Sequence, residues 1–139
     1  MFSWPIRVYY EDTDAGGVVY HASYLGFMER ARTEWLRSLG LEQDELMKTH
    51  HLIFAVRSLT IDYLKPALFN DQLYVESSIL KLGKASIVFK QQIKRTNQDI
   101  VELLIDSEVK IASINAKGEI KKAMLIPKDI YQLFSSSLD

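Results

Sequence analysis

The chain has 139 residues, 47% hydrophobic and 25% charged, with 17 Lys and Arg against 18 Asp and Glu. This length buries one core, so we expect a single domain over residues 1–139. The formal net charge of −1 gives no sign of a nucleic-acid-binding surface, and we expect no nucleic-acid partner. The absence of cysteine excludes disulfides, a thiolate nucleophile and cysteine-ligated metal sites.

The N-terminal sequence MFSWPIRVYY lacks the basic start and long apolar core of a secretory signal, and no apolar run is long enough to span a membrane. We therefore expect a soluble, unprocessed protein. A chain without cysteine also suits a reducing compartment, and the predicted location is the cytoplasm.

The first predicted element is a strand. After Pro5, the residues Ile6, Val8 and Tyr10 alternate with more polar neighbours, and this period of two predicts a strand with one face inward. The strand is expected to stop at the acidic residues that follow.

Helical spacing begins at Ser23. Large apolar residues then recur every three or four positions, while charged residues mostly occupy the other side. Ser23 is expected to be the N-cap, and Gly40 is expected to end the helix. A second, shorter helix is expected over residues 43–49. The apolar positions of the long helix are Tyr24, Phe27, Met28, Ala31, Trp35 and Leu39.

From Leu52 onward the sequence alternates in long runs separated by short turns, a pattern that predicts antiparallel hairpins and a meander. Pro127 is expected to open a C-terminal helix through Phe134. The predicted fold class is therefore α+β. We expect an antiparallel sheet of five to six strands wrapped around a central helix, because only the helix over 24–39 is long enough to cover one face of such a sheet.

The joint between the first strand and the long helix, EDTDAGGVVYHAS, places three carboxylates, a Gly-Gly pair and a histidine close together. Asp12, Asp14 and Gly17 fit three positions of a calcium loop, but Ser23 stands where a bidentate Glu is required. Dinucleotide-binding, phosphate-binding and serine-hydrolase motifs are absent as well.

What remains is a carboxylate beside a backbone segment whose glycines allow unusual conformations, and this segment runs into a helix N-terminus. The N–H groups exposed there stabilise an oxygen on which negative charge develops. Asp14 is the candidate for activating water or attacking directly, with His21 positioning water or substrate. The pattern favours transfer of an acyl group to water, and no metal is required.

Residues 5–38 resemble the YbgC-type acyl-coenzyme A thioesterases of the hot-dog superfamily, near the 4-hydroxybenzoyl-coenzyme A thioesterases. The resemblance implies a hot-dog fold and hydrolysis of an acyl-coenzyme A. The shared signature is Tyr-x-Asp-Thr-Asp-x-x-Gly-Val-Val-Tyr-His-x-x-Tyr, filled here by Tyr10, Asp12, Thr13, Asp14, Gly17, Val18, Val19, Tyr20, His21 and Tyr24.

By this resemblance, Asp14 is the catalytic nucleophile or general base, and a backbone N–H near His21 donates to the thioester carbonyl. The side chains of Tyr10 and His21 resemble the residues that accompany the aspartate. Where the relative that acts on an aromatic acid has Pro and Asn, this chain has Ala15 and Ser23, which favours an aliphatic acyl group.

The resemblance also implies the partners. The expected substrate is acyl-coenzyme A, with acyl carrier protein as an alternative carrier. No metal or redox cofactor is expected, and coenzyme A enters only as part of the substrate. Edge-to-edge pairing of sheets implies a homodimer with the site at its interface, or a homotetramer of two such dimers.

Several of these residues also have structural interpretations. Asp12 is expected to bond turn amides, and Tyr10 and Tyr24 are expected to pack with a tethered hydroxyl. The side chain of His21 is either structural or functional. Glu29 either pairs with a neighbour on the helix or points into the cleft, and we favour the pair.

Two rival functions remain open. One is another hot-dog reaction on a thioester, such as hydration, although the Asp-Thr-Asp signature favours hydrolysis. The other is a non-catalytic module that binds acyl groups or acyl carrier protein. Thiol release from an acyl-coenzyme A panel separates hydrolysis from binding alone.

Overall fold

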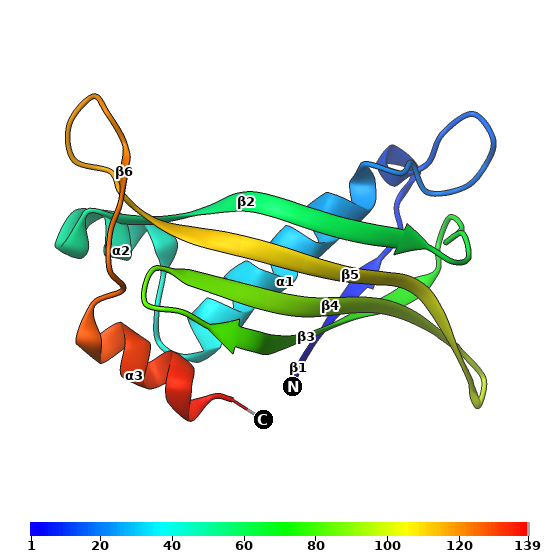
Figure 1. The fold of residues 1–139 in the computed structure, drawn as a ribbon. Helices are drawn as coiled ribbons and strands as arrows, with labels where there is room; N and C mark the ends of the chain where they lie inside the picture. The colour runs from blue at the N-terminus through cyan, green and yellow to red at the C-terminus, as the bar shows by residue number, and fades with distance from the viewer. Residues whose placement is uncertain (139) are drawn as a thin grey trace.

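A six-stranded antiparallel sheet curls around helix α1 (Ser23–Ser38), as Figure 1 shows. The computed structural model describes residues 1–138. This arrangement confirms the predicted sheet wrapped around a central helix. The strands are β1 (Phe2–Arg7), β2 (Leu52–Tyr63), β3 (Gln72–Leu82), β4 (Ser86–Asn97), β5 (Ile100–Asn115) and β6 (Lys122–Ala123).

The strand order is β1-β3-β4-β5-β2, with β6 paired to the end of β5. The predicted hairpins β3–β4 and β4–β5 are confirmed. The meander prediction was wrong for β2, which pairs with β5 and lies at the edge of the sheet. The reason is that β1 takes the edge of β3 that a meander would give to β2. β2 therefore has one open side.

The predicted strand at the N-terminus is shorter than expected. β1 ends at Arg7, and Tyr10–Asp12 form a 3₁₀ turn. The Asp12 carboxylate accepts a hydrogen bond from the backbone N–H of Tyr9, with N···Oδ2 2.8 Å, and this bond turns the chain away from the sheet. Tyr10 is consequently 77% exposed rather than on an inward strand face.

The helix boundaries follow the sequence with small differences. Ala22, not Ser23, is the N-cap of α1, and no side chain caps the helix there. Gly40 adopts φ +82° directly after the C-cap, a left-handed conformation that suits glycine, so the predicted end is confirmed. The two shorter helices that the sequence predicts are present as α2 (Gln43–His50) and α3 (Lys128–Ser136). Their bounds differ from the predicted ones by at most two residues.

The side of α1 that faces the sheet carries a buried polar contact as well as apolar packing. Gln91 of β4 is 0% exposed. Its Nε2 donates to the carbonyl of Met28 at 3.0 Å and to Ser77 Oγ at 2.9 Å. Its Oε1 accepts from Arg32 at 2.9 Å. One amide thus ties the middle of the helix to two strands.

Replacing Gln91 with Leu should lower the free energy of unfolding by about 2–4 kcal/mol, because the groups that it now bonds would be left buried without partners. Urea denaturation measures this loss. Gln92→Leu is the matched control, since Gln92 bonds only the partly exposed Asp106. Equal losses for the two variants would contradict the role given to Gln91.

Candidate active site

The loop between β1 and α1 is a closed turn with Asp14 near its tip. Thr13 and Val19 form an antiparallel bridge, and the backbone N–H of Asp14 donates to the Val18 carbonyl at 2.9 Å. Gly17 has φ +81°, a left-handed conformation that other side chains rarely adopt. The backbone freedom expected from the glycines is therefore used at Gly17, where the chain reverses.

The carboxylate of Asp14 is exposed and partly held by its own turn. Its Oδ1 accepts a hydrogen bond from the backbone N–H of Gly16 at 2.8 Å. A Cβ added at Gly16 would lie 3.2 Å from that oxygen, so glycine leaves the carboxylate room. One oxygen is thus anchored while the carboxylate stays open to solvent.

Asp12 has a different environment. It is buried, its carboxylate accepts from Tyr9, and its backbone carbonyl accepts from the N–H of Tyr20 at 2.8 Å. These bonds close the base of the loop. The structural interpretation of Asp12 is confirmed.

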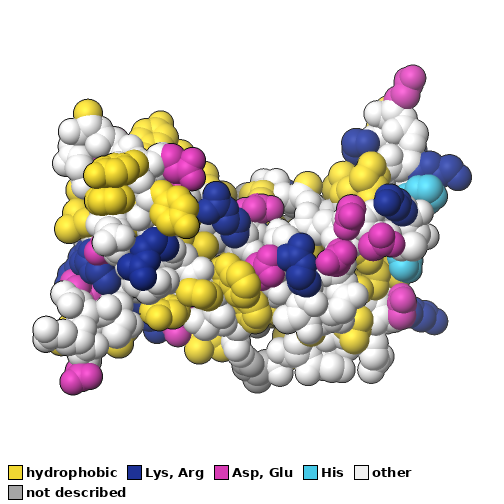
Figure 2. All heavy atoms as spheres, turned by 180° about the vertical axis from the view of Figure 1, so that it is seen from behind, with side chains coloured by type: hydrophobic (Ala, Val, Ile, Leu, Met, Phe, Trp, Pro, Cys, Tyr) yellow, Lys and Arg dark blue, Asp and Glu magenta, His cyan; other side chains and the backbone are white. Residues whose placement is uncertain are grey.

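Tyr10 and Tyr24 lie in contrasting places. Tyr10 is exposed and stacks on Phe69, with ring centroids 4.0 Å apart. Tyr24 is 3% exposed, its hydroxyl oxygen accepts from the N–H of Ala67 at 3.0 Å, and burial raises its pKa. Tyr24 packs with a tethered hydroxyl as expected, whereas Tyr10 stacks at the surface and its hydroxyl has no hydrogen-bond partner within residues 1–138. Figure 2 shows hydrophobic side chains gathered on the projecting lobe that includes this loop.

His21 lies just before α1 and is exposed. Its backbone carbonyl accepts from the hydroxyl of Tyr63 at 3.0 Å, and its ring packs 4.5 Å from the ring of Tyr20. Within residues 1–138 no hydrogen bond joins the side chains of Asp14, His21 and Tyr10. The structure places all three on one loop without linking them directly.

The start of α1 offers unpaired backbone donors. The N–H of Ser23 donates to Tyr20 and that of Leu25 donates to Ala22, whereas those of His21 and Ala22 find no acceptor among the described residues. These N–H groups lie at the positive end of the α1 dipole. The resemblance to the YbgC-type thioesterases predicts a backbone donor to the thioester carbonyl in this region, near His21.

Three hollows follow one another between α1 and the edge strand β2. The first, beside the start of α1, is lined by His21, Tyr24 and Tyr63. The second and third share Glu29, Arg32 and Val56. The three hollows together are called the groove; the second and third share lining residues, whereas the first shares none with them. The second is lined mainly by Leu25, Met28, Val56, Leu59 and Val109.

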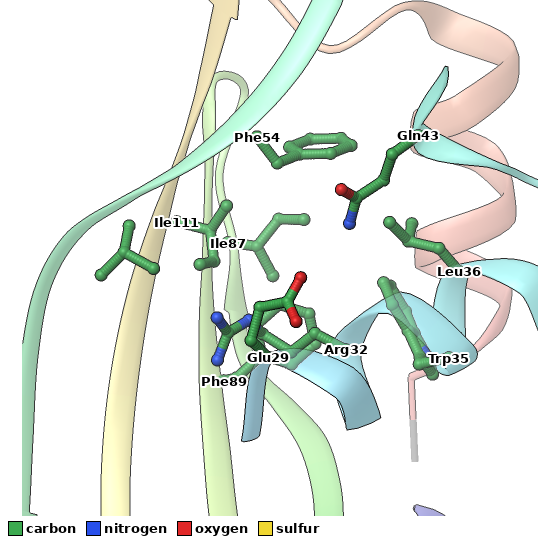
Figure 3. A pocket seen from close by; sticks show the side chains of 10 residues that line it. Glu29, Arg32, Trp35, Leu36, Gln43, Phe54, Ile87, Phe89 and Ile111 are labelled. Carbon is green, nitrogen blue, oxygen red and sulfur yellow. The ribbon is translucent and has the colours of Figure 1, made fainter. Parts of the chain in front are cut away.

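The far end of the groove, drawn in Figure 3, combines apolar walls with polar side chains. Glu29 accepts from Thr33 Oγ1 at 3.2 Å, so it makes the expected pair on the helix and also lines the groove. Burial lowers the pKa of Arg32, and the nearby Glu29 carboxylate opposes this effect. Helical spacing places Arg32 among the charged residues on the solvent side of the helix, so its hydrogen bond to the buried Gln91 was not predictable from the sequence.

No cluster of three or more His, Cys, Asp or Glu side chains suited to a metal ion occurs in the part of the chain that the structure describes. In the same part, none of the helices has the length and apolar character that crossing a membrane requires.

Comparison with known proteins gives consistent matches. The family model described as the thioesterase superfamily matches residues 16–102. The acyl-CoA thioesterase YbgC of Haemophilus influenzae is 44% identical over 133 residues, covering 96% of this chain and 93% of the relative. The acyl-CoA thioester hydrolase YbgC of Escherichia coli O157:H7 is 42% identical over 134 residues, covering 96% of each chain.

Solved structures agree with these matches. A probable thioesterase from Bartonella henselae superposes with a TM-score of 0.80 at 35% identity, covering 90% of this chain and 98% of that one. A 4-hydroxybenzoyl-CoA thioesterase complexed with 4-hydroxybenzoyl-CoA gives a TM-score of 0.89 at 19% identity, covering 94% and 96%, and shows the shared hot-dog fold. The chain therefore belongs to the thioesterase superfamily and, within it, to the YbgC group.

Proposed function

We propose that this thioesterase hydrolyses an acyl-coenzyme A to the free acid and coenzyme A, with Asp14 as the attacking carboxylate or general base. One observation carries the assignment. The turn that presents Asp14 leads directly into the start of α1, where the N–H groups of His21 and Ala22 have no acceptor within residues 1–138.

The reaction follows from this juxtaposition. A thioester carbonyl oxygen that accepts from these N–H groups develops negative charge at the positive end of the helix. Either Asp14 attacks the carbonyl carbon, expelling the thiolate and leaving an anhydride for water to cleave, or it takes a proton from an attacking water. In both routes the C–S bond breaks, one water is consumed, and the sulfur leaves as a thiol after protonation.

His21 and Tyr10 have supporting roles in this proposal. The exposed ring of His21 lines the first hollow of the groove, where it would position water or substrate. Tyr10 stacks on Phe69 beside the same loop and would form a wall of the entrance. The reaction requires no metal or redox cofactor, and coenzyme A enters with the substrate.

We propose an aliphatic acyl group. The second hollow is walled mainly by aliphatic side chains, among them Leu25, Val56 and Leu59. The solved structures of thioesterases for aromatic acyl-CoA substrates are 19–24% identical to this chain, so their likeness concerns the fold.

We further propose a homodimer that pairs at the open edge of β2, or a tetramer of such dimers. Unpaired strand edges are templates for pairing with another strand. β2 also forms one wall of the groove, so pairing there would put the site at the interface. Acyl carrier protein remains a proposed alternative carrier, and the cytoplasm remains the proposed location.

Asp14→Asn should lower kcat at least a hundredfold, because an amide neither attacks the thioester nor accepts a proton from water. The amide oxygen still accepts from Gly16, so the fold should persist. Thiol release measures the rate, and circular dichroism and gel filtration check the fold and assembly. Glu11→Gln, an exposed neighbouring acid, is the control. Turnover by Asp14→Asn close to that of the wild type would contradict the assignment.

A panel of coenzyme A thioesters should show kcat/KM at least tenfold higher for straight aliphatic acyl groups than for benzoyl groups, because the second hollow is lined mainly by aliphatic side chains. A thiol reagent reports release. A preference for aromatic thioesters would refute the aliphatic assignment. Background release throughout the panel, together with binding of the thioesters, would favour the non-catalytic module.

Light scattering should give a mass of at least twice the 16.0 kDa of one chain, because β2 leaves a sheet edge open. Replacing Thr60 of β2 with Asp in both chains of such an assembly should weaken it by placing like charges at the edge. A monomer at micromolar concentration would contradict the proposed pairing.

A further inference from the structure

The segment between β2 and β3 supports both parts of the proposed site. The Ala67 carbonyl accepts from the N–H of Val19 at 2.9 Å, and Val18 forms a bridge with Leu68. The N–H of Ala67 donates to the hydroxyl of Tyr24, in the first turn of α1. Residues 66–68 therefore contact the Asp14 turn on one side and the start of the helix on the other.

This segment is held by an arginine from the sheet. Arg95 of β4 donates from Nη1 to the Pro66 carbonyl at 3.1 Å and to Asp71 Oδ2 at 2.8 Å. The same Asp71 oxygen accepts from the N–H of Leu68 at 2.8 Å. The guanidinium and the carboxylate thus fix the backbone at both ends of residues 66–68.

Arg95 is itself fixed from its other side. Its Nε and Nη2 each lie 3.3 Å from a carboxylate oxygen of Glu102 on β5. The Nζ of Lys65 lies 3.4 Å from Oε2 of the same carboxylate. The side chains of Arg95 and Asp71 are 16% and 21% exposed. Their hydrogen bond raises the pKa of Arg95, although burial opposes this. The guanidinium therefore stays charged, with donors used on both sides.

Arg95, Asp71 and Glu102 do not line the groove, so Arg95 acts on the reaction through the residues that it contacts, among them Pro66 in the segment 66–68. The distance between the carboxylate and the N–H donors depends on that segment, because each rests on it. Misplacement of reacting groups by about 1 Å can cost a hundredfold in rate.

We propose that Arg95 is a positioning residue for the hydrolysis. Together with Asp71 it holds residues 66–68, and through them it sets the placement of the Asp14 turn against the start of α1. This inference rests on the proposed function, and it concerns kcat rather than the affinity for coenzyme A.

Arg95→Met should lower kcat at least tenfold, because the reacting groups lose alignment, and should change KM by a smaller factor, because the second and third hollows of the groove are not lined by residues 66–68. The matched control is Lys94→Met. Lys94 is the neighbouring residue on β4 and also pairs with a partly buried acid, Glu76, but that pair touches neither loop. Lys94→Met should keep both constants within twofold of the wild type.

A second comparison separates positioning from general loss of structure. In an Asp14→Asn background, Arg95→Met should change the residual rate less than twofold, because the group that it aligns has been removed. Arg95→Lys keeps the charge and one donor, so it should fold and give an intermediate kcat. Thermal denaturation identifies a temperature at which every variant is folded for these assays.

The outcomes are distinct. An unchanged kcat in folded Arg95→Met, equal losses in Arg95→Met and Lys94→Met, or the same loss in the Asp14→Asn background would each overturn the positioning role while leaving the proposed function in place. Wild-type turnover by Asp14→Asn alone would instead refute the proposed function, whatever Arg95→Met does.

Discussion

The orientation of α1 on the sheet depends on a single buried amide. Gln91 can bond the Met28 carbonyl and the Arg32 guanidinium only at one rotation of the helix about its axis. That rotation puts Phe27 and Ala31 into the core and leaves Leu25 and Glu29 facing β2. The side of α1 that lines the groove follows from this rotation. Apolar packing alone is less directional, and it would define the rotation less sharply.

Sequence patterns gave most of the elements, because hydrophobic period and turn residues are local. Alternation located β3, β4 and β5, and helical spacing located α1 with its end at Gly40. The predictions that were wrong failed because of non-local pairing or side-chain contacts. The strand ran on past Arg7 in the prediction because alternation continues there, whereas the Asp12 carboxylate turns the chain. The edge position of β2 depends on β1 pairing with β3, which no local pattern reports.

The candidate site was predictable to a similar extent. The Asp-Thr-Asp motif pointed to Asp14 and to the helix start, and the structure places Asp14 on the turn that leads into α1. It also separates two acids of similar chemistry, since Asp12 is buried with bonds to its own loop and Asp14 is exposed. The groove and the Arg95–Asp71 contact were not predictable from local patterns, because they join residues that meet only when the strands are in register.

The backbone contact of Val18 and Val19 with residues 67–68 affects the order in which parts of the fold form. The two sides of that contact lie far apart in the chain, and closing so long a loop is slow compared with forming α1. During synthesis the Asp14 turn leaves the ribosome long before Ala67, and longer still before Arg95. A nascent chain therefore carries the carboxylate and the helix without the support that brings them together. Under the proposed function, chemical competence arrives with the middle strands of the sheet, so an incomplete chain would have the motif but not the site.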